Sequence, residues 1–263
     1  MRALAVAAVL ILGALIVWGV SWASYLPQFS IRTVSVLGAE RVPTPLIQNY
    51  VESILHDGSH PTFSRSNIIL YPRASIEKAV ESFFPRIKSA SISRGSLLAT
   101  AIAVVVEERT TFARWCTLTQ CYVMDEGGFV FAEFSGNTNS ASTTHYIFRG
   151  GIESDENPIG QRFAPAHLPG ILVLLTLLGQ AGFHPLGGSI DNEQDLSILF
   201  KEGFALKVSF GQDANTLTKN LELVLSSEVL KEKKGQLEYI DLRFDNRVYY
   251  KMRGEGEAMS TGQ

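Results

Sequence analysis

The chain has 263 residues, of which 46% are hydrophobic, so it can bury the core of one large or two ordinary domains and is not disordered as a whole. Its 23 basic and 26 acidic side chains give a net charge of −3. A nucleic-acid partner is therefore disfavoured, because there is no basic surplus to neutralise phosphates.

Residues 1–26 predict a short cytoplasmic tail followed by a transmembrane helix. Residues 3–20 carry no charge and, with the six that follow, are long enough to cross a bilayer as a helix. Amphipathic aromatic rings favour the headgroup layer, and three stand at the downstream end, at Trp18, Trp22 and Tyr25.

The charge before the apolar run sets the expected orientation. Arg2 favours a cytoplasmic N-terminus, hence a single-pass protein of the cell (inner) membrane whose bulk is extracytoplasmic or periplasmic. A cleaved signal peptide is the alternative, because residues 21–23 resemble a small-x-small cleavage site. Either way, the body of the chain lies outside the cytoplasm.

Residues 27–110 predict a small α+β domain with the order strand, helix, helix, strand, strand. Apolar residues recur at helical spacing over 43–55 and 75–84. Runs rich in β-branched and apolar residues predict strands at 29–37, 87–94 and 97–106.

Residues 111–252 predict a second, mainly β domain with two helices. The first helix, 168–182, is apolar on nearly every side, but its roughly 11 uninterrupted residues fall short of a second membrane span. The second is capped by Asp213 or Asn215. Strands are expected at 121–124, 129–134, 146–148, 196–200, 204–210 and within 237–251.

Two polar segments follow the second helix pattern. Three lysines, Lys231, Lys233 and Lys234, are expected to complement the negative end of that helix, with anionic lipid contact as the alternative. Residues 253–263 are small, polar and acidic, and predict a disordered tail.

The chain offers few groups for chemistry. Cys116 and Cys121 can close a disulfide across a tight loop between strands, or stand as two thiols; a zinc site would need further ligands. His56 and His60 are four apart, but Gly58 and Pro61 break any helix that would align them. No metal, cofactor or catalytic residue is predicted, since no known nucleophile, phosphate-loop or metalloprotease motif occurs and the other histidines, at 145, 167 and 184, are scattered.

Several motifs together resemble one family. The order of the first domain directly after an anchor resembles a polypeptide-transport-associated (POTRA) domain, and the local residues resemble the FtsQ/DivIB cell-division family. The matching positions are Val34-x-Val36-x-Gly38, Val42, Ile47, Pro85-x-Ile87-x-x-Ala90-x-Ile92-x-Arg94, Glu108-Arg109, Ala113-x-Trp115 and residues 239–246. The chain departs from the family in lacking a proline after Arg94 and in carrying two extra residues before Glu108.

Five of these positions are expected to be structural: Gly38, Arg94, Glu108, Arg109 and Arg243. Gly38 is expected to take a positive φ at a strand exit. Glu108 and Arg109 are expected to form ion pairs where the domains join.

The end of the second domain is the expected binding region. In 237–251, alternation places Ile240, Leu242 and Phe244 on the core face. The last strand would then keep an open edge, unless its tyrosines merely cap the core, and the resemblance implies that this edge accepts a strand from an FtsB/DivIC-like subunit bound to an FtsL-like one. The expected partner-binding residues are Phe244, Asn246, Arg247, Val248, Tyr249 and Tyr250.

The resemblance implies a non-enzymatic assembly protein of the cell-division complex, located at the division septum, which scaffolds or regulates septal wall synthesis by binding these bitopic coiled-coil partners. Two alternatives remain: a POTRA-containing protein of outer-membrane assembly or secretion, and an anchored cell-wall enzyme.

Overall fold

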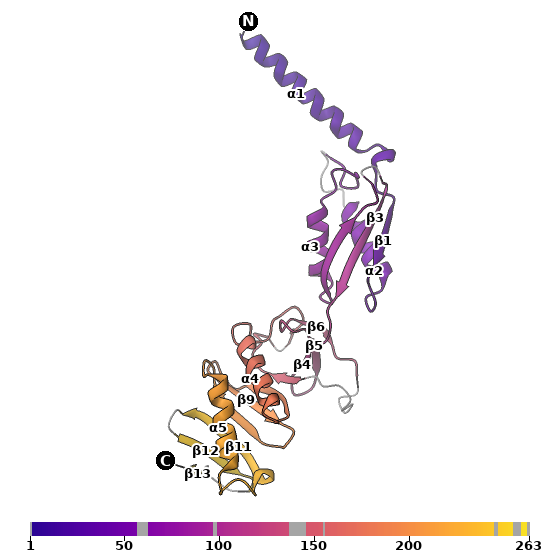
Figure 1. Cartoon of the computed structure of the whole chain (residues 1–263). Helices are drawn as coiled ribbons and strands as arrows, with labels where there is room; N and C mark the ends of the chain where they lie inside the picture. The colour runs from indigo at the N-terminus through magenta and orange to yellow at the C-terminus, as the bar shows by residue number, and fades with distance from the viewer. Residues whose placement is uncertain are drawn as a thin grey trace. The chain divides into compact units, whose positions relative to one another are not determined.

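The computed structural model describes residues 2–56, 63–96, 99–136, 146–154, 156–244, 247–254 and 259–261. The chain is α+β and divides into two compact units, Met1–Arg109 and Thr110–Gln263 (Figure 1). This division falls one residue before the predicted one.

The N-terminal helix α1 (Arg2–Ser24) is the predicted anchor. Its segment Val6–Ser24 has a mean hydropathy of 2.3 and, in the part of the chain that the structure describes, is the one helix long and apolar enough to cross a bilayer. Its last residue, Ser24, is tied to the following domain, because its carbonyl accepts a hydrogen bond from Asn67 Nδ2 (3.0 Å) and its hydroxyl accepts one from Ser64 N (3.1 Å).

The rest of the first unit has the predicted order of elements, with a three-stranded sheet in the order β1-β3-β2. β1 lies parallel to β3, whereas β2 is antiparallel to it. Helix α2 packs beside β1 and α3 beside β2, burying apolar residues such as Ile47 and Ile76 in one core. The elements are η1 (Pro27–Phe29), β1 (Thr33–Leu37), α2 (Thr44–Leu55), α3 (Arg73–Phe83), β2 (Ile87–Ser93) and β3 (Ala101–Glu108).

Gly38 takes the predicted positive φ, +83°, where the chain leaves β1. A Cβ built there would lie 2.2 Å from the carbonyl oxygen of Val106 on β3. Both the backbone angle and the space therefore require glycine at this strand exit.

Three more predicted structural residues act on the backbone. Arg94 donates from its guanidinium to the carbonyl of Ile68, and Arg109 Nε donates to Pro85 O (3.0 Å). Glu108 accepts from three consecutive backbone N–H groups, those of residues 40, 41 and 42, at 2.9, 2.8 and 2.8 Å. The described hydrogen bonds of the Glu108 carboxylate thus hold the loop before α2. They do not join Glu108 to Arg109.

Glu108 predicts a pH-dependent stability of the first unit. Burial opposes its ionisation, but the hydrogen bonds from residues 40–42 outweigh this and lower its pKa below the ordinary value. Its stabilisation is therefore complete above the unfolded pKa of about 4.3 and is lost as the pH falls through the lower, folded pKa.

We expect Glu108→Gln to cost about 1–3 kcal/mol of unfolding free energy at neutral pH, because charge-assisted hydrogen bonds are lost, and to flatten the acid limb of the pH profile. Denaturant titrations followed by far-ultraviolet circular dichroism measure both. The control is Glu107→Gln, whose carboxylate makes a surface ion pair with Lys88 (3.4 Å) and whose loss costs about 0–1 kcal/mol. Equal effects of the two variants would contradict the assigned role of Glu108.

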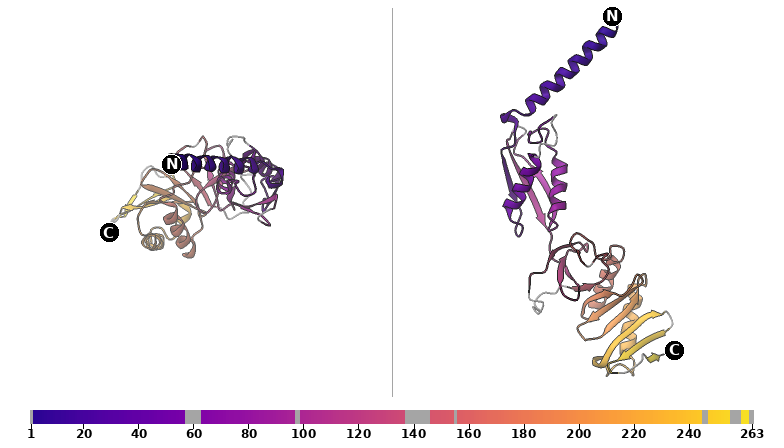
Figure 2. Two further views of the ribbon diagram at one scale, coloured as in Figure 1. Left: turned by 90° about the horizontal axis from the view of Figure 1, so that it is seen from above. Right: turned by 180° about the vertical axis from the view of Figure 1, so that it is seen from behind.

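The second unit is a ten-stranded sheet in the order β13-β12-β11-β10-β9-β8-β7-β4-β5-β6. Helices α4 and α5 lie side by side on one face, and the view from behind shows the strands from the other face (Figures 1 and 2). The elements are β4 (Ala113–Cys116), β5 (Cys121–Met124), β6 (Val130–Glu133), β7 (Tyr146–Arg149), α4 (Leu168–Gln180), β8 (Pro185–Ile190), β9 (Asp195–Phe200), β10 (Ala205–Ser209), α5 (Ala214–Ser226), η2 (Lys234–Gln236), β11 (Leu237–Phe244), β12 (Arg247–Met252) and β13 (Met259–Thr261).

Both helices of this unit cover its core. Helix α4 is 13 residues long and buries leucines such as Leu174, Leu175 and Leu178, as a core helix does and a membrane span does not. Asp213 is the N-cap of helix α5, and its carboxylate accepts a hydrogen bond from Thr216 N (2.8 Å).

The predicted position of the three lysines is wrong. Helix α5 ends at Ser226, and residues 227–233 form turns before η2, so Lys231, Lys233 and Lys234 do not belong to the last turn of the helix. Leu230 explains this early end, because it is buried in the core and the turns carry it there.

Candidate functional site

The β11–β12 hairpin contains the residues that the sequence predicts for partner binding. β11 lies between β10, to which it is parallel, and β12, to which it is antiparallel. The register opposes Asp241 to Tyr249 and Phe244 to Arg247, so that two residues of β11 face one residue of β12 between these pairs. This register shift is a β-bulge next to the end of the hairpin.

The bulge ends the predicted alternation of side chains. Ile240 and Leu242 are buried as predicted, but Phe244 is 52% exposed and does not pack on the core. The extra residue turns its side chain away from the face that parity assigns to it. The prediction for Phe244 as a core residue is wrong, whereas its exposure leaves it available for binding.

The six predicted binding residues divide between the core and the surface. Tyr250 lies opposite Ile240 and is buried, and Val248 is partly buried against the same core. These two are core-side residues, so the alternative that a tyrosine caps the core holds for Tyr250. Asn246 lies outside the described residues.

The remaining three residues, Phe244, Arg247 and Tyr249, form what we call the hairpin surface. The rings of Phe244 and Tyr249 meet edge to face with centroids 5.3 Å apart. Arg247 is exposed at the start of β12, and the guanidinium of Arg243 lies 5.7 Å from the Phe244 centroid. The structure thus brings an exposed phenylalanine, a partly buried tyrosine and a basic residue to the end of the hairpin.

The expected open edge of β12 is partly occupied. β13 pairs antiparallel with β12, with residues 248, 249 and 250 opposite residues 261, 260 and 259. The predictions that this edge is unpaired and that residues 253–263 are wholly disordered are therefore wrong for the segment Met259–Thr261. This three-residue strand was missed because its pairing depends on contact with β12 and not on a pattern of its own.

Arg243 holds a polar network beside this hairpin. Its guanidinium donates to both carboxylate oxygens of Asp241, at 2.9 and 2.6 Å, and to Asp195 Oδ2 at 2.8 Å. The hydrogen bonds to Asp241 raise the pKa of Arg243, and those from Asn192 and then Arg243 lower the pKa of Asp195. The network joins β11 to β9 through the side chain of Arg243.

Two other sheet edges are closed by the chain itself. On β2, the N–H groups of Ala90 and Ile92 donate to the carboxylates of Glu81 (3.0 Å) and Glu77 (2.7 Å) from α3. These glutamates were missed by sequence reasoning, although their spacing of four on a helix places them on one face. On β6, Val130 exchanges hydrogen bonds with the backbone of residues 160 and 161. The remaining edge of the first sheet is β1.

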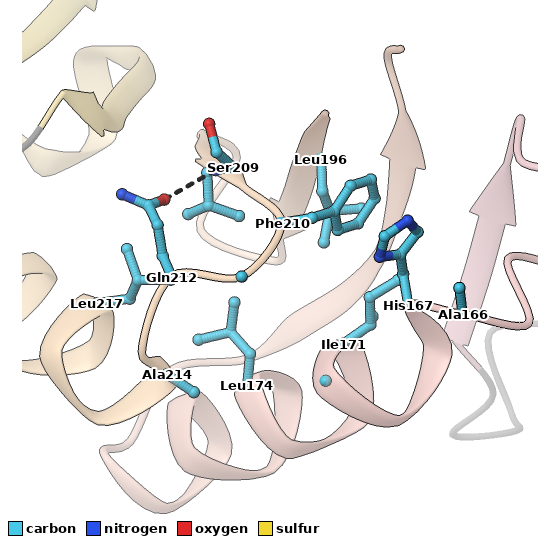
Figure 3. Close-up of a pocket in the computed structure, with 13 residues that line it drawn as sticks. Ala166, His167, Ile171, Leu174, Leu196, Ser209, Phe210, Gln212, Ala214 and Leu217 are labelled. Carbon is cyan, nitrogen blue, oxygen red and sulfur yellow. Dashed lines mark hydrogen bonds between the residues drawn. The ribbon is translucent and has the colours of Figure 1, made fainter. Parts of the chain in front are cut away.

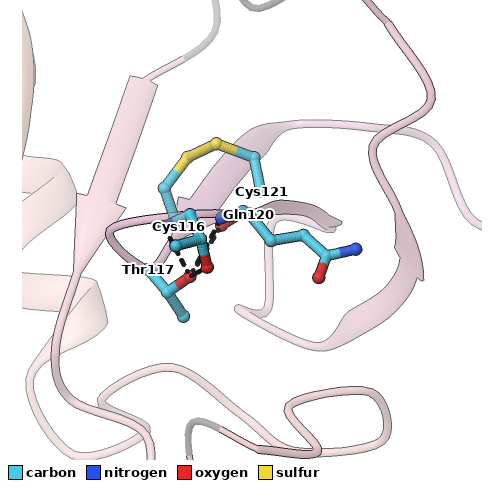
Figure 4. The surroundings of a disulfide bond; sticks show 5 residues. Cys116, Thr117, Gln120 and Cys121 are labelled. Carbon is cyan, nitrogen blue, oxygen red and sulfur yellow. Dashed lines mark hydrogen bonds between the residues drawn. A yellow bond between two sulfur atoms is a disulfide. The ribbon is translucent and has the colours of Figure 1, made fainter.

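Cys116 and Cys121 form the predicted disulfide between β4 and β5, where they lie opposite each other (Figure 4). Inside the loop, Thr117 Oγ1 accepts from the backbone N–H of Gln120 at 3.0 Å. The bridge and this turn fix the end of a hairpin, and the two sulfurs are not available as metal ligands or nucleophiles.

A cavity of about 280 Å³ lies between α4, the end of β10 and the start of α5 (Figure 3). Its walls are mostly apolar, and the ring of His167 stacks on Phe210 with centroids 3.9 Å apart. The hydroxyl of Ser209 donates to Asp195 (2.9 Å), the same carboxylate that Arg243 binds, so Ser209 belongs to the polar network of Arg243.

The histidines do not assemble a metal site in the described part of the chain. His56 Nδ1 contacts Glu52 O (2.9 Å) and His184 Nδ1 contacts the carboxylate of Glu202 (2.8 Å), while His60 and His145 lie outside the described residues. Among the described residues, no group of three or more His, Cys, Asp and Glu side chains could hold a metal ion.

Compared with protein-family models and with curated proteins, this chain matches none of either.

Proposed function

We propose that this chain is a bitopic, non-enzymatic cell-division protein of the FtsQ/DivIB kind, acting at the division septum. It binds single-pass coiled-coil proteins of the FtsB/DivIC and FtsL kinds at the C-terminal end of its second sheet, and so scaffolds or regulates septal wall synthesis. The observation that carries the proposal is the β11–β12 hairpin, where exposed Phe244 meets Tyr249 beside a sheet edge that, among the described residues, a three-residue strand occupies.

The order of the elements supports this assignment. An apolar helix is followed by a unit with the order strand, helix, helix, strand, strand, which is the order of a POTRA domain, and then by a mainly β unit. Gly38, Glu108 and Arg243 fix the backbone where the resemblance to the family places structural residues. These features fit two extracytoplasmic domains on a single anchor.

Strand addition gives the binding mechanism. An extended partner segment would pair with the backbone of β12, and the hairpin surface would supply side-chain specificity. A few backbone hydrogen bonds at about 1 kcal/mol each and the burial of Phe244 and Tyr249 at about 1.5–3 kcal/mol each reach the roughly 8 kcal/mol of micromolar binding.

Purification of the full-length protein from its own membranes tests the proposal. We expect one or two small single-pass coiled-coil proteins in stoichiometric amount, and filamentous cells when the chain is depleted. The purified ectodomain should leave peptidoglycan unchanged. Turnover of peptidoglycan would favour an anchored wall enzyme, and copurification with outer-membrane barrel proteins would favour an assembly or secretion factor.

A further inference from the structure

The edge that the proposed partner needs is already paired within the chain. β12 has six residues, and β13, with three residues, pairs with only its middle part, residues 248–250. Paired strand edges of this kind prevent other chains from adding to a sheet. Contacts from the same unit likewise occupy edge groups of β2 at Ala90 and Ile92 and of β6 at Val130, so occupation of the β12 edge by β13 has parallels elsewhere in the chain.

We propose that β13 is an internal placeholder, which occupies the partner-binding edge of β12 until a strand of the partner displaces it. The inference rests on the proposed function, because the competing strand is that of the coiled-coil partner. It adds that binding is an exchange of one strand for another, and that the C-terminal segment lowers the apparent affinity of the site.

The lengths of the strands make the exchange favourable. A partner strand that pairs along Arg247–Met252 replaces three paired positions by six, and can also cover Phe244 and Tyr249. β13 runs antiparallel to β12, so an antiparallel partner strand would use the same backbone groups. Two or three backbone hydrogen bonds, less the cost of closing the connecting loop, hold β13 only weakly.

The strength with which β13 pairs with β12 sets the expected change in partner affinity when β13 is removed. The apparent Kd of a site that is open for a fraction of the time equals the intrinsic Kd divided by that fraction. If β13 is displaced in about a tenth of the molecules, its removal tightens partner binding about tenfold.

Three forms of the protein in detergent test the inference: the natural chain, a chain ending at Gly254, and a chain with Val248→Cys and Thr261→Cys, which oppose each other in the register. The probe is the FtsB/DivIC-like protein encoded with this chain, in complex with its FtsL-like subunit. We expect the shortened chain to bind about tenfold more tightly and the oxidised double-cysteine chain to bind at least tenfold more weakly. Reductant should restore binding of the latter, and the natural chain treated with reductant controls for loss of the Cys116–Cys121 bridge.

Hydrogen exchange without the partner gives a second readout. Of the amides of residues 248–250, those that point to the edge should exchange more slowly in the natural chain than in the shortened one. Equal exchange would show that β13 does not close the edge, and equal partner affinity of the two forms would show that it does not compete; either result overturns this inference and leaves the proposed function standing. Loss of binding in the shortened chain alone would also overturn only the inference, because β13 would then be needed for binding. Absence of partner binding by the natural chain would overturn the proposed function.

Discussion

Replacing Gly187 by alanine is expected to unfold the second unit. Gly187 lies in β8 with a φ of +139°, and a Cβ built there would lie 1.9 Å from the carbonyl oxygen and 2.6 Å from the nitrogen of Ile147 on β7. Both obstacles are backbone atoms in the middle of the sheet, so the clash can be relieved only by separating β7 from β8. We expect a loss of about 4 kcal/mol or more of unfolding free energy.

Tryptophan fluorescence measures this effect well. Trp115 is buried in β4 of the second unit, while Trp18 and Trp22 lie in α1, so a change on denaturation reports mainly the second unit. Gly179→Ala is the matched control, because a Cβ there meets nothing within 4 Å and alanine favours the helix α4 by about 0.5–1 kcal/mol. An unchanged denaturation midpoint for Gly187→Ala would contradict the register of β7 and β8.

A proline at one of two neighbouring positions in β12, 248 or 249, is expected to weaken partner binding strongly. Successive amides of a strand point to opposite neighbours, so of Val248→Pro and Tyr249→Pro one removes an N–H directed at β11 and the other an N–H directed at the edge. The edge-directed substitution should weaken partner binding on the order of 100-fold, equivalent to about 2.7 kcal/mol, because the ring removes a donor and blocks the approach of a strand. The other should mainly lower the denaturation midpoint.

The side chains of the hairpin surface give the matching test. Phe244→Glu should abolish partner capture, since it places a charge where an aromatic ring is expected to be buried. The control is Leu223→Glu on α5, an apolar residue that is also exposed (68%) but belongs to another element. If both prolines and Phe244→Glu leave a folded protein with unchanged affinity, partners bind elsewhere.

Much of the fold follows from local patterns. The order of the first unit, the helices over 44–55 and 73–83, and the hairpin over 196–210 agree with apolar periodicity and turn residues. β8 was missed because Pro185, Gly187 and Gly188 are ordinarily signs of a turn. In the sheet the same glycines permit close approach of neighbouring backbones, which only the tertiary structure reveals.

The candidate site was predictable only in part. Alternation placed Ile240 and Leu242 correctly in the core, but the bulge that exposes Phe244 depends on the pairing of β11 with β12 and has no signal in a single strand. The burial of Tyr250 follows from its position opposite Ile240. The pairing of β13 is likewise a long-range property, since its three residues, Met259–Thr261, are too few to show an alternating pattern.

Site-specific photocrosslinking in living cells tests the central claim most directly. A photoreactive residue in place of Arg247, exposed at the start of β12, should crosslink to the FtsB/DivIC-like partner. Leu118, fully exposed on the β4–β5 loop, should give no such product, and Ser35 on β1 tests the competing edge. We predict a partner crosslink at Arg247 alone; crosslinks at Ser35 or Leu118 with none at Arg247 would contradict binding at the C-terminal edge.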